Sequence, residues 1–262
     1  MDLQLKDRHV LITGGSKGIG LACARQYLAE GARVCIVSRS QANIDQAIER
    51  LRGEGFTAQG YAADLIDAQA AQRMVEEVEA AQGPIDILVN SAGAARRTPF
   101  NELTPKIWGE AMQAKFFTYI NVIDPLVKRM AQRGRGAIVN IVGMGGKIAS
   151  PTHLAGGSAN AALNLATAGL AAAYAAQGVR INSVNPGGTL TERMAEGFAA
   201  EARLRNISTE EVGRLAQARM PLGRFADPEE IANATLFLSS PRASYITGAI
   251  LSMDGALTPL VV

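Results

Sequence analysis

A glycine-rich turn near the start of the chain places the strongest constraint on its fold. The segment reads Val10-Leu11-Ile12-Thr13-Gly14-Gly15-Ser16-Lys17-Gly18-Ile19-Gly20. Its apolar run predicts a buried strand, and the apolar spacing over 19–28 predicts a helix directly after the turn. Glycine permits the backbone angles and close approaches of such a turn, and the amides at the start of a helix suit a pyrophosphate. An ordinary strand–helix turn that is rich in glycine by chance is the alternative, so the turn needs support from the rest of the chain.

Further apolar runs alternate with helical patterns along the whole chain. We expect strands at 10–12, 33–38, 56–62, 85–89, 137–142, 179–184 and 249–253. We expect helices at 19–28, 44–51, 68–81, 105–133, 158–176 and 228–238, the long one kinked at Pro125. This alternation predicts a seven-stranded parallel sheet covered on both faces, which is a three-layer α/β/α sandwich. No linker or repeat divides the 262 residues, so one domain is expected, with its ligand site beyond the carboxyl ends of the strands.

The composition argues against several classes of protein. The formal net charge is only +2 and no basic run is interleaved with aromatic residues, so no nucleic-acid partner is expected. No apolar stretch reaches the length of a membrane span, and the first residues lack the pattern of a signal peptide. We therefore expect a cytoplasmic protein with no membrane partner. Cys23 and Cys35 fall on interior-facing positions and are interpreted as reduced, buried thiols rather than as a disulfide or a metal site.

The helix expected over 158–176 is rich in alanine and leucine and has almost no polar face. A helix that is apolar all round is buried all round. We therefore expect it to pack against a second subunit as well as its own sheet, in a symmetric homo-oligomer that is a tetramer or a dimer.

Several motifs follow the predicted strands in a fixed order. They are Thr13-Gly14-x-x-x-Gly18-x-Gly20, Asn90-Ser91-Ala92-Gly93 and Asn185-Pro186-Gly187, and then Gly223-Arg224-Phe225, Tyr245-Ile246-Thr247-Gly248 and Asp254-Gly255. Together they resemble the short-chain dehydrogenase/reductase family over essentially the whole chain. The resemblance implies a single Rossmann-type domain over residues 1–262 that binds NAD(P)(H), acts on a small-molecule substrate and is usually a tetramer.

The resemblance also implies which residues contact the cofactor. The residues expected around the pyrophosphate are Gly14, Ser16, Ile19 and Gly20. Those expected around the adenosine are Asp64, Leu65, Asn90, Ala92 and Gly93. Those expected around the nicotinamide are Pro186, Gly187 and Thr191.

The end of the second strand bears on the choice between NAD and NADP. A carboxylate there would bind the ribose hydroxyls of NAD and repel a 2′-phosphate, but the strand ends in Ser38-Arg39. Arg39 offers a planar fork to a phosphate, and Lys17 adds a second positive charge, so we predict NADP(H) as the cofactor. The alternative is that Arg39 stacks on the adenine and Lys17 is a solvated turn residue.

The catalytic half of the family's pattern is missing. The resemblance implies a tyrosine as general acid/base, a lysine four residues later, a serine after the fifth strand and an asparagine on the long helix. Aligned by spacing, these positions hold Gly156, Asn160, Gly143 and Lys115. No tyrosine of the chain has a lysine four residues later.

Two side chains near these positions can still exchange a proton. His153 lies three residues before the tyrosine position, and Lys115 stands at the asparagine position. Histidine titrates near neutrality, and desolvation lowers the pKa of a lysine, so both are candidate catalytic residues. The alternatives are a histidine at the rim of a loop and a lysine that bonds strand or loop carbonyls.

The sequence thus favours an NADP(H)-dependent oxidoreductase acting on a small carbonyl, alcohol, imine or enone substrate. An NADP(H)-binding protein without hydride chemistry, such as a sensor, is a second hypothesis. A lyase that uses the same pocket with His153 as base is a third. Residues at about 190–220 are expected to form a flap over the substrate.

Overall fold

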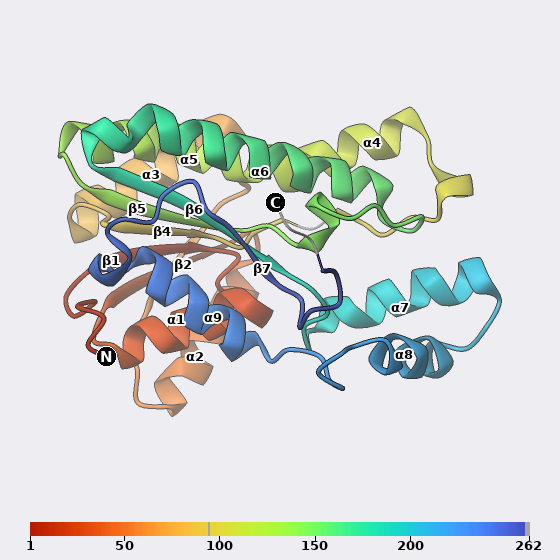
Figure 1. Ribbon diagram of the computed structural model, residues 1–262. Coiled ribbons are helices and arrows are strands. Elements are labelled where there is room, and N and C mark those ends of the chain that lie inside the picture. The colour runs from red at the N-terminus through yellow and green to blue at the C-terminus, as the bar shows by residue number, and fades with distance from the viewer. Residues whose placement is uncertain (94, 260–262) are drawn as a thin grey trace.

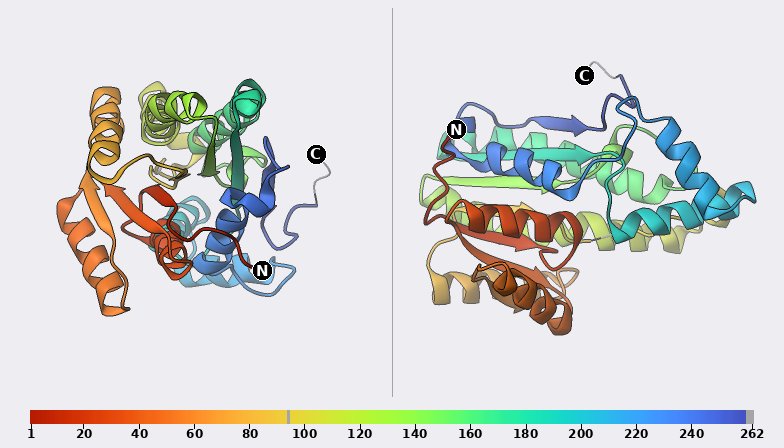
Figure 2. Two further views of the ribbon diagram at one scale, coloured as in Figure 1. Left: turned by 90° about the vertical axis from the view of Figure 1, so that its left-hand side faces the viewer. Right: turned by 90° about the horizontal axis from the view of Figure 1, so that it is seen from below.

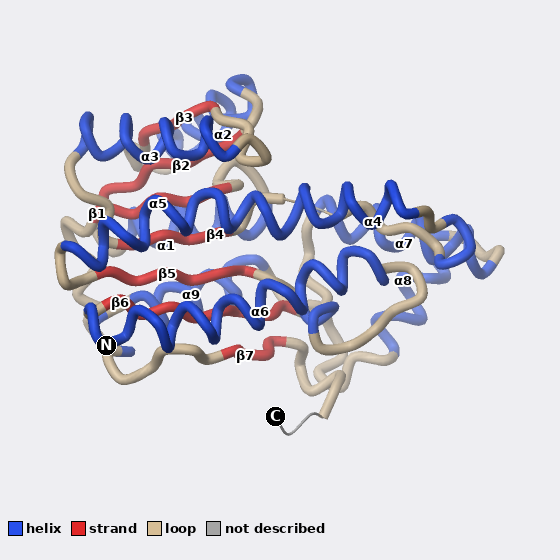
Figure 3. The backbone as a smooth tube through the Cα atoms, turned by 90° about the horizontal axis from the view of Figure 1, so that it is seen from above, coloured by secondary structure: helices blue, strands red, loops and turns tan. Residues whose placement is uncertain are grey.

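The seven strands of the computed structural model, which describes residues 1–93 and 95–259, form one parallel sheet. The order across the sheet is β3-β2-β1-β4-β5-β6-β7 (Figure 3). The bounds are β1 His9–Thr13, β2 Arg33–Ser38, β3 Gln59–Ala62, β4 Ile87–Asn90, β5 Gly136–Ile141, β6 Val179–Pro186 and β7 Ile250–Met253. All seven were predicted, although β3 begins at Gln59, later than expected.

Helices cover both faces of the sheet (Figures 1 and 2). One face carries α1 Gly18–Ala29, α2 Gln41–Gly53 and α9 Pro228–Ser239, and the other carries α3 Ala68–Gln82, α5 Thr118–Gln132 and α6 Leu154–Tyr174. Successive side chains of a strand point to opposite faces, so Val10 and Ile12 pack in one core and Leu11 in the other. Burial on both faces explains why the five inner strands read as continuous apolar runs, whereas the edge strands β3 and β7 are exposed or half-buried. The predicted Rossmann-type α/β/α sandwich is confirmed.

The order of the strands places the ends of β1 and β4 side by side. The chain moves outward from β1 to β3 and then returns to lay β4 against the other edge of β1. Thr13 pairs with Asn90 at the carboxyl ends of these two strands. In open parallel sheets the crevice at such a reversal is where ligands bind. The glycine turn after β1 and the residues after β4 therefore border one crevice.

The long helix expected over 105–133 is interrupted before Pro125. Helix α4 spans Pro105–Ala111, a wider π-helical segment spans Met112–Phe117, and α5 follows and runs through Pro125. Wide turns of this kind are frequent at functional sites. Here the wide turn carries Lys115, whose side chain is buried.

Helix α4 and two later helices, α7 Glu192–Arg205 and α8 Thr209–Ala218, project beyond the carboxyl ends of the strands (Figure 1). Short 3₁₀ turns span Phe100–Glu102, Met144–Gly146, Ala175–Gln177 and Pro241–Ala243. Within the described ranges, no helix has both the length and the apolar character that crossing a membrane requires.

Candidate active site

The turn after β1 contains close backbone contacts that require glycine. Gly14 adopts a φ of +67°, and a Cβ there would lie 2.8 Å from the Cα of Ala92 in the turn after β4. A Cβ on Gly20 would overlap the carbonyl group of Gly14. Lys17, the N-cap of α1, makes no side-chain hydrogen bond to the first turn of the helix. The amides of that turn, around Ile19, are thus left for an anionic ligand.

A row of buried polar side chains fixes the end of β4. Thr13 Oγ1 donates to Asn90 Oδ1 at 3.2 Å, and Asn90 Nδ2 donates to Asn140 Oδ1 at 3.0 Å. Asn140 Nδ2 donates to Thr167 Oγ1 of α6 at 3.0 Å. The amide of Ala92 donates to Thr13 Oγ1 at 3.3 Å. Asn90 therefore helps to hold the turn after β4 in place at the edge of the crevice.

The residues expected on the adenosine side follow β2 and β3. Arg39 directly follows β2 and is exposed, and Asp64 and the buried Leu65 follow β3. Lys17 Nζ lies 3.5 Å from Glu192 Oε2, and both side chains are more than half exposed, at 54% and 82%. An exposed pair of this kind contributes little to stability, so Lys17 is available to a phosphate. The two cations expected at the phosphate end both lie on the carboxyl side of the sheet.

The loop after β6 lies against the glycine turn. Pro186 ends β6 and is buried, and the amide of Gly187 donates to the Met253 carbonyl at 2.9 Å. Thr191 is the N-cap of α7, and a Cβ on Gly18 would lie 3.4 Å from its Cγ2. The residues expected on the nicotinamide side are thus brought beside those expected around the pyrophosphate, where Ser16 is half-buried.

Glycines form the floor of the space beside the start of α6. Gly143 adopts a φ of +124°, and a Cβ there would lie 3.3 Å from Asn160 Nδ2. A Cβ on Gly145 would lie 2.8 Å from His153 Cδ2, and one on Gly156 would overlap His153 Cε1. The imidazole of His153 therefore fills the space that a side chain at position 156 would need. The positions expected for the family's serine, tyrosine and lysine do come together here.

Two buried polar atoms in this space lack a hydrogen-bond partner among the residues that the structure describes, Asn160 Oδ1 and His153 Nδ1. Leaving such an atom unpaired costs about 1–3 kcal/mol, so both atoms can accept a hydrogen-bond partner from a ligand or from water. Burial lowers the pKa of His153 to about 4, and the charges of Arg97, Arg193 and Lys115 act in the same direction. The imidazole is accordingly neutral at pH 7.

Lys115 reaches inward from the π-helical segment and is 8% exposed. Its Nζ donates to Tyr119 Oη at 2.7 Å and to the Ile141 carbonyl at 3.0 Å. Burial lowers its pKa to about 7, and the charge of Arg193 lowers it as well. Ile141 is the last residue of β5. The hydrogen bond to its carbonyl is the strand contact expected if the role of Lys115 is structural. The lowered pKa also lets Lys115 exchange a proton near neutral pH.

Two arginines at this site were missed from the sequence. Arg193 lies in the first turn of α7, and its Nη1 donates to the Gly93 carbonyl at 3.3 Å. Arg97 lies in the loop after β4, and a Cβ on Gly197 of α7 would lie 2.9 Å from its Nε. Neither arginine belongs to a motif. The signal that could have found them is their position, since both follow strands whose carboxyl ends border the crevice.

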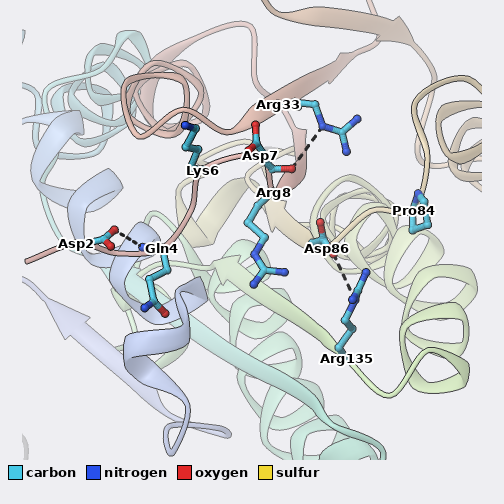
Figure 4. Close-up of a pocket in the computed structure, with 9 residues that line it drawn as sticks. All are labelled: Asp2, Gln4, Lys6, Asp7, Arg8, Arg33, Pro84, Asp86 and Arg135. Carbon is cyan, nitrogen blue, oxygen red and sulfur yellow. Dashed lines mark hydrogen bonds and ion pairs between the residues drawn. The ribbon is translucent and has the colours of Figure 1, made fainter.

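Two surface hollows lie at different ends of the molecule. One of about 650 Å³ lies at the amino ends of the strands, where Asp86 lies near Arg135 and Asp7 near Arg33 (Figure 4). Its charges are mixed and it contains none of the expected site residues. A second hollow, of about 420 Å³, lies on the first turns of α7 and is lined by Leu190, Thr191, Glu192, Met194, Ala195 and Phe198. Only this second hollow belongs to the crevice side.

The residues around the crevice fit a nicotinamide dinucleotide. The glycines of the turn allow the backbone to pack closely at the end of β1, and the start of α1 offers free amides. Asn160 Oδ1 is a buried acceptor in need of a donor such as a ribose hydroxyl. Across the described ranges, no group of three or more His, Cys, Asp or Glu side chains is gathered as a metal ion requires.

Comparison with known proteins agrees with this geometry. A family model described as enoyl-(acyl carrier protein) reductase matches residues 14–258. Gluconate 5-dehydrogenase of Gluconobacter oxydans is 33% identical over 254 residues, which cover 97% of this chain and 96% of that protein. An actinorhodin polyketide ketoreductase crystallised with NADPH superposes with a TM-score of 0.93 at 29% identity, covering 97% and 98% of the two chains. L-sorbose reductase from Gluconobacter frateurii, complexed with NADPH and L-sorbose, superposes with a TM-score of 0.90 at 28% identity over 100% of both chains. The chain belongs to the short-chain dehydrogenase/reductase family of oxidoreductases.

Proposed function

We propose that the chain is an NADP(H)-dependent oxidoreductase that reduces a small carbonyl, imine or enone or oxidises the corresponding alcohol. The observation that carries the proposal is the crevice between β1 and β4, with its glycine turn, its free helix amides and its buried Thr13–Asn90–Asn140–Thr167 row. The NADPH-bound structural neighbours support the cofactor.

Arg39 is proposed to bind the 2′-phosphate of NADP(H), with Lys17 as a second cation. Charge-assisted hydrogen bonds contribute about 1.5–3 kcal/mol. Arg39→Gln should therefore weaken NADPH binding about 10- to 100-fold and leave NADH binding unchanged, as measured by fluorescence titration. Arg73→Gln, which removes an exposed arginine on α3, is the matched control. Equal weakening of both cofactors would refute this role of Arg39.

The active site is proposed to be atypical, since Lys115, Gly143, Gly156 and Asn160 stand where the family's catalytic side chains are expected. The bound nicotinamide supplies or accepts a hydride at its C4 carbon. The chain must then orient the substrate, exclude water and stabilise charge on the substrate oxygen. A neutral His153 can donate one ring N–H to that oxygen, and Lys115 can exchange a proton near pH 7.

The loss of the tyrosine is compatible with turnover. Positioned general acid catalysis contributes about 10²–10⁴ in rate, whereas holding two reactants together contributes roughly 7–11 kcal/mol. Positioning is thus the larger effect. We therefore expect a slow reductase, or one whose substrate needs little protonation, such as an iminium or an activated double bond.

The direct test is NADPH oxidation against a panel of ketones, imines and enones. Turnover of at least one of them is expected, and His153→Ala should lower it about 10²-fold or more without changing NADPH affinity. The absence of any oxidation above background would contradict the proposal.

A second candidate is an NADP(H)-binding protein without hydride chemistry. It is favoured by the contacts of Lys115, whose Nζ is held by Tyr119 and Ile141. It predicts NADPH affinity without turnover. A lyase that uses His153 as base is separated from it by His153→Ala, which would abolish lyase activity and leave NADPH binding intact.

Residues 190–220 are proposed to be a flap over the substrate. Helices α7 and α8 stand beyond the sheet on the crevice side, and the apolar side chains of Leu190, Met194 and Phe198 line the hollow there. Hydrogen exchange of these helices should slow when NADPH and substrate bind together. Exchange that does not change would remove the flap from the proposal.

The chain is also proposed to form a homo-oligomer through α6. Leu165 on this helix is 78% exposed, and Ala161 and Ala172 are exposed beside it. Leu165→Glu should lower the mass measured by light scattering to that of a smaller species. Leu222→Glu, at a 66% exposed leucine outside α6, is the control and should leave the mass unchanged.

A further inference from the structure

Arg97 and Arg193 converge on the space next to His153. Arg193 contacts the Gly93 carbonyl in the turn after β4, and Arg97 lies against Gly197 on the same helix as Arg193. The loop that carries Arg97 is fixed beside the loop that carries His153, because the Thr98 amide donates to the Thr152 carbonyl at 3.0 Å. The charges of both arginines contribute to the lowered pKa of His153. Arg97 and Arg193 therefore place two positive charges near His153.

Neither arginine has a carboxylate partner in direct contact. The charges of Glu196 and Glu201 act on Arg193 and Arg97 respectively, yet within the described part of the chain neither arginine makes an ion pair of 4.0 Å or less. Other arginines do: Arg224 Nη1 lies 2.6 Å from Glu230 Oε2. Like charges held together without a counter-ion repel one another. A bound anion would reduce the repulsion between Arg97 and Arg193.

Both arginines lie at the boundary between protein and solvent. Both residues keep more than a third of their surface accessible to solvent. Nevertheless, loss of hydration is the largest cause that lowers the pKa of each guanidinium. Protein atoms thus surround part of each guanidinium while solvent reaches the rest. An opposite charge bound at such a group is less screened than at a fully solvated one.

Arg97 lies apart from the phosphate end of the crevice, and Arg193 reaches the Gly93 carbonyl from the first turn of α7. A Cβ on Gly156 would lie 2.8 Å from Ala95 Cβ, so the loop that carries Arg97 packs on the start of α6. The free amides for a pyrophosphate are instead those at the start of α1. The group that the arginines bind is therefore expected on the substrate.

We propose that the substrate carries an oxyanion, a carboxylate or a phosphate ester, that Arg97 and Arg193 bind while its reacting carbonyl or alcohol lies against His153. This rests on the proposed function in one respect only, that the site beside His153 takes a substrate. The planar fork of each guanidinium matches a carboxylate or phosphate. The bound anion also offsets the positive charges around His153 and so favours a protonated imidazole.

The experiment uses matched probes that differ in charge. They are levulinate with its methyl ester, and dihydroxyacetone phosphate with dihydroxyacetone. Binding to the full chain, with and without NADP⁺, is followed by the NMR signal of His153, which is simple to assign because the chain has only two histidines. NADPH oxidation with the same four probes is measured separately, so that binding and turnover are read independently.

We expect the anionic member of at least one pair to bind 10-fold or more tightly than its neutral twin, and the pair that shows it separates carboxylate from phosphate. Arg97→Gln and Arg193→Gln should each reduce the preference by 10-fold or more, and Arg193→Lys should restore part of it. Arg96→Gln is the matched control, because Arg96 is exposed and its charge is not among those that act on His153. It should leave the preference unchanged.

Equal binding of charged and neutral twins, no response to either anion, or a preference that survives both arginine variants would overturn the inference. A charge preference in binding, without NADPH oxidation by these probes or by any member of the panel above, would instead contradict the proposed oxidoreductase function and leave the anion site standing. Thermal melting of each variant, compared with the parent chain, separates loss of binding from loss of the fold.

Discussion

Replacing Lys115 by methionine tests whether burial in the folded chain makes the Lys115 side chain lose its proton, and thus its charge. Burial lowers its pKa from 10.5 to about 7, and the Arg193 charge acts in the same direction. Between these two values the unfolded chain holds a proton that the folded chain has released. Stability must therefore rise with pH across this window, by about 1.4 kcal/mol per unit, and lose this dependence below pH 7. From pH 7 to 9.5 the gain is on the order of 3 kcal/mol.

Lys115→Met removes this gain and little else. Methionine fills a similar volume, and the Ile141 carbonyl keeps its hydrogen bond from Tyr119 Oη at 2.6 Å. At pH 7 the variant should be as stable as the parent or more so, since apolar replacement of a buried charge is often neutral or stabilising. The free energy of unfolding would be measured by urea titration at steps from pH 5 to 9.5. The parent should gain about 3 kcal/mol on the variant between pH 7 and 9.5 and nothing between pH 5 and 6. Parallel curves for the two proteins over the whole range would refute the reasoning.

Three further predictions concern packing and hydrogen bonds. Arg180→Lys should cost about 2 kcal/mol in urea titration, because the guanidinium donates to four backbone carbonyls near the end of α9 at 2.7–3.1 Å and an ammonium cannot reach all of them; unchanged stability would contradict this. Asn140→Leu should cost about 1–3 kcal/mol by the same assay, since it leaves the buried polar groups on either side unpaired; a neutral result would show that the row can rearrange. Gly156→Ala should displace the His153 ring and shift its NMR signal, whereas Gly109→Ala, with nothing within 4 Å of its added Cβ, should leave that signal in place and gain up to about 1 kcal/mol; an unmoved His153 signal in Gly156→Ala would count against the packing described.

The sheet and its covering helices could be predicted because their signals are local. Strands buried on both faces read as apolar runs, and amphipathic helices repeat with the helical period. The start of β3 was missed because Phe56 extends the apolar run although it precedes the strand. The position of the break in the long helix was missed for another reason. Pro125 signals a local defect, but the π-helical turn at Met112–Phe117 involves hydrogen bonds of Lys115 to β5, a distant segment.

More residues of the cofactor side of the site than of the substrate side could be predicted from the sequence. Each motif there lies within a few residues of a strand end, so parallel topology alone brings the motifs together. Arg97 and Arg193 meet only because α7 folds back over the loop after β4. No periodicity or spacing in the chain encodes that approach. The packing of His153 against Gly156 could not be predicted from the sequence either. Only the structure shows that the His153 ring occupies the space that a side chain at position 156 would need.

Gly18 in the glycine turn lies close to Thr191, the N-cap of the projecting helix α7, since a Cβ added to Gly18 would lie 3.4 Å from Thr191 Cγ2. A ligand bound at the turn would therefore lie close to the residue from which α7 begins. Substrate affinity is therefore expected to depend on whether a dinucleotide already occupies the turn.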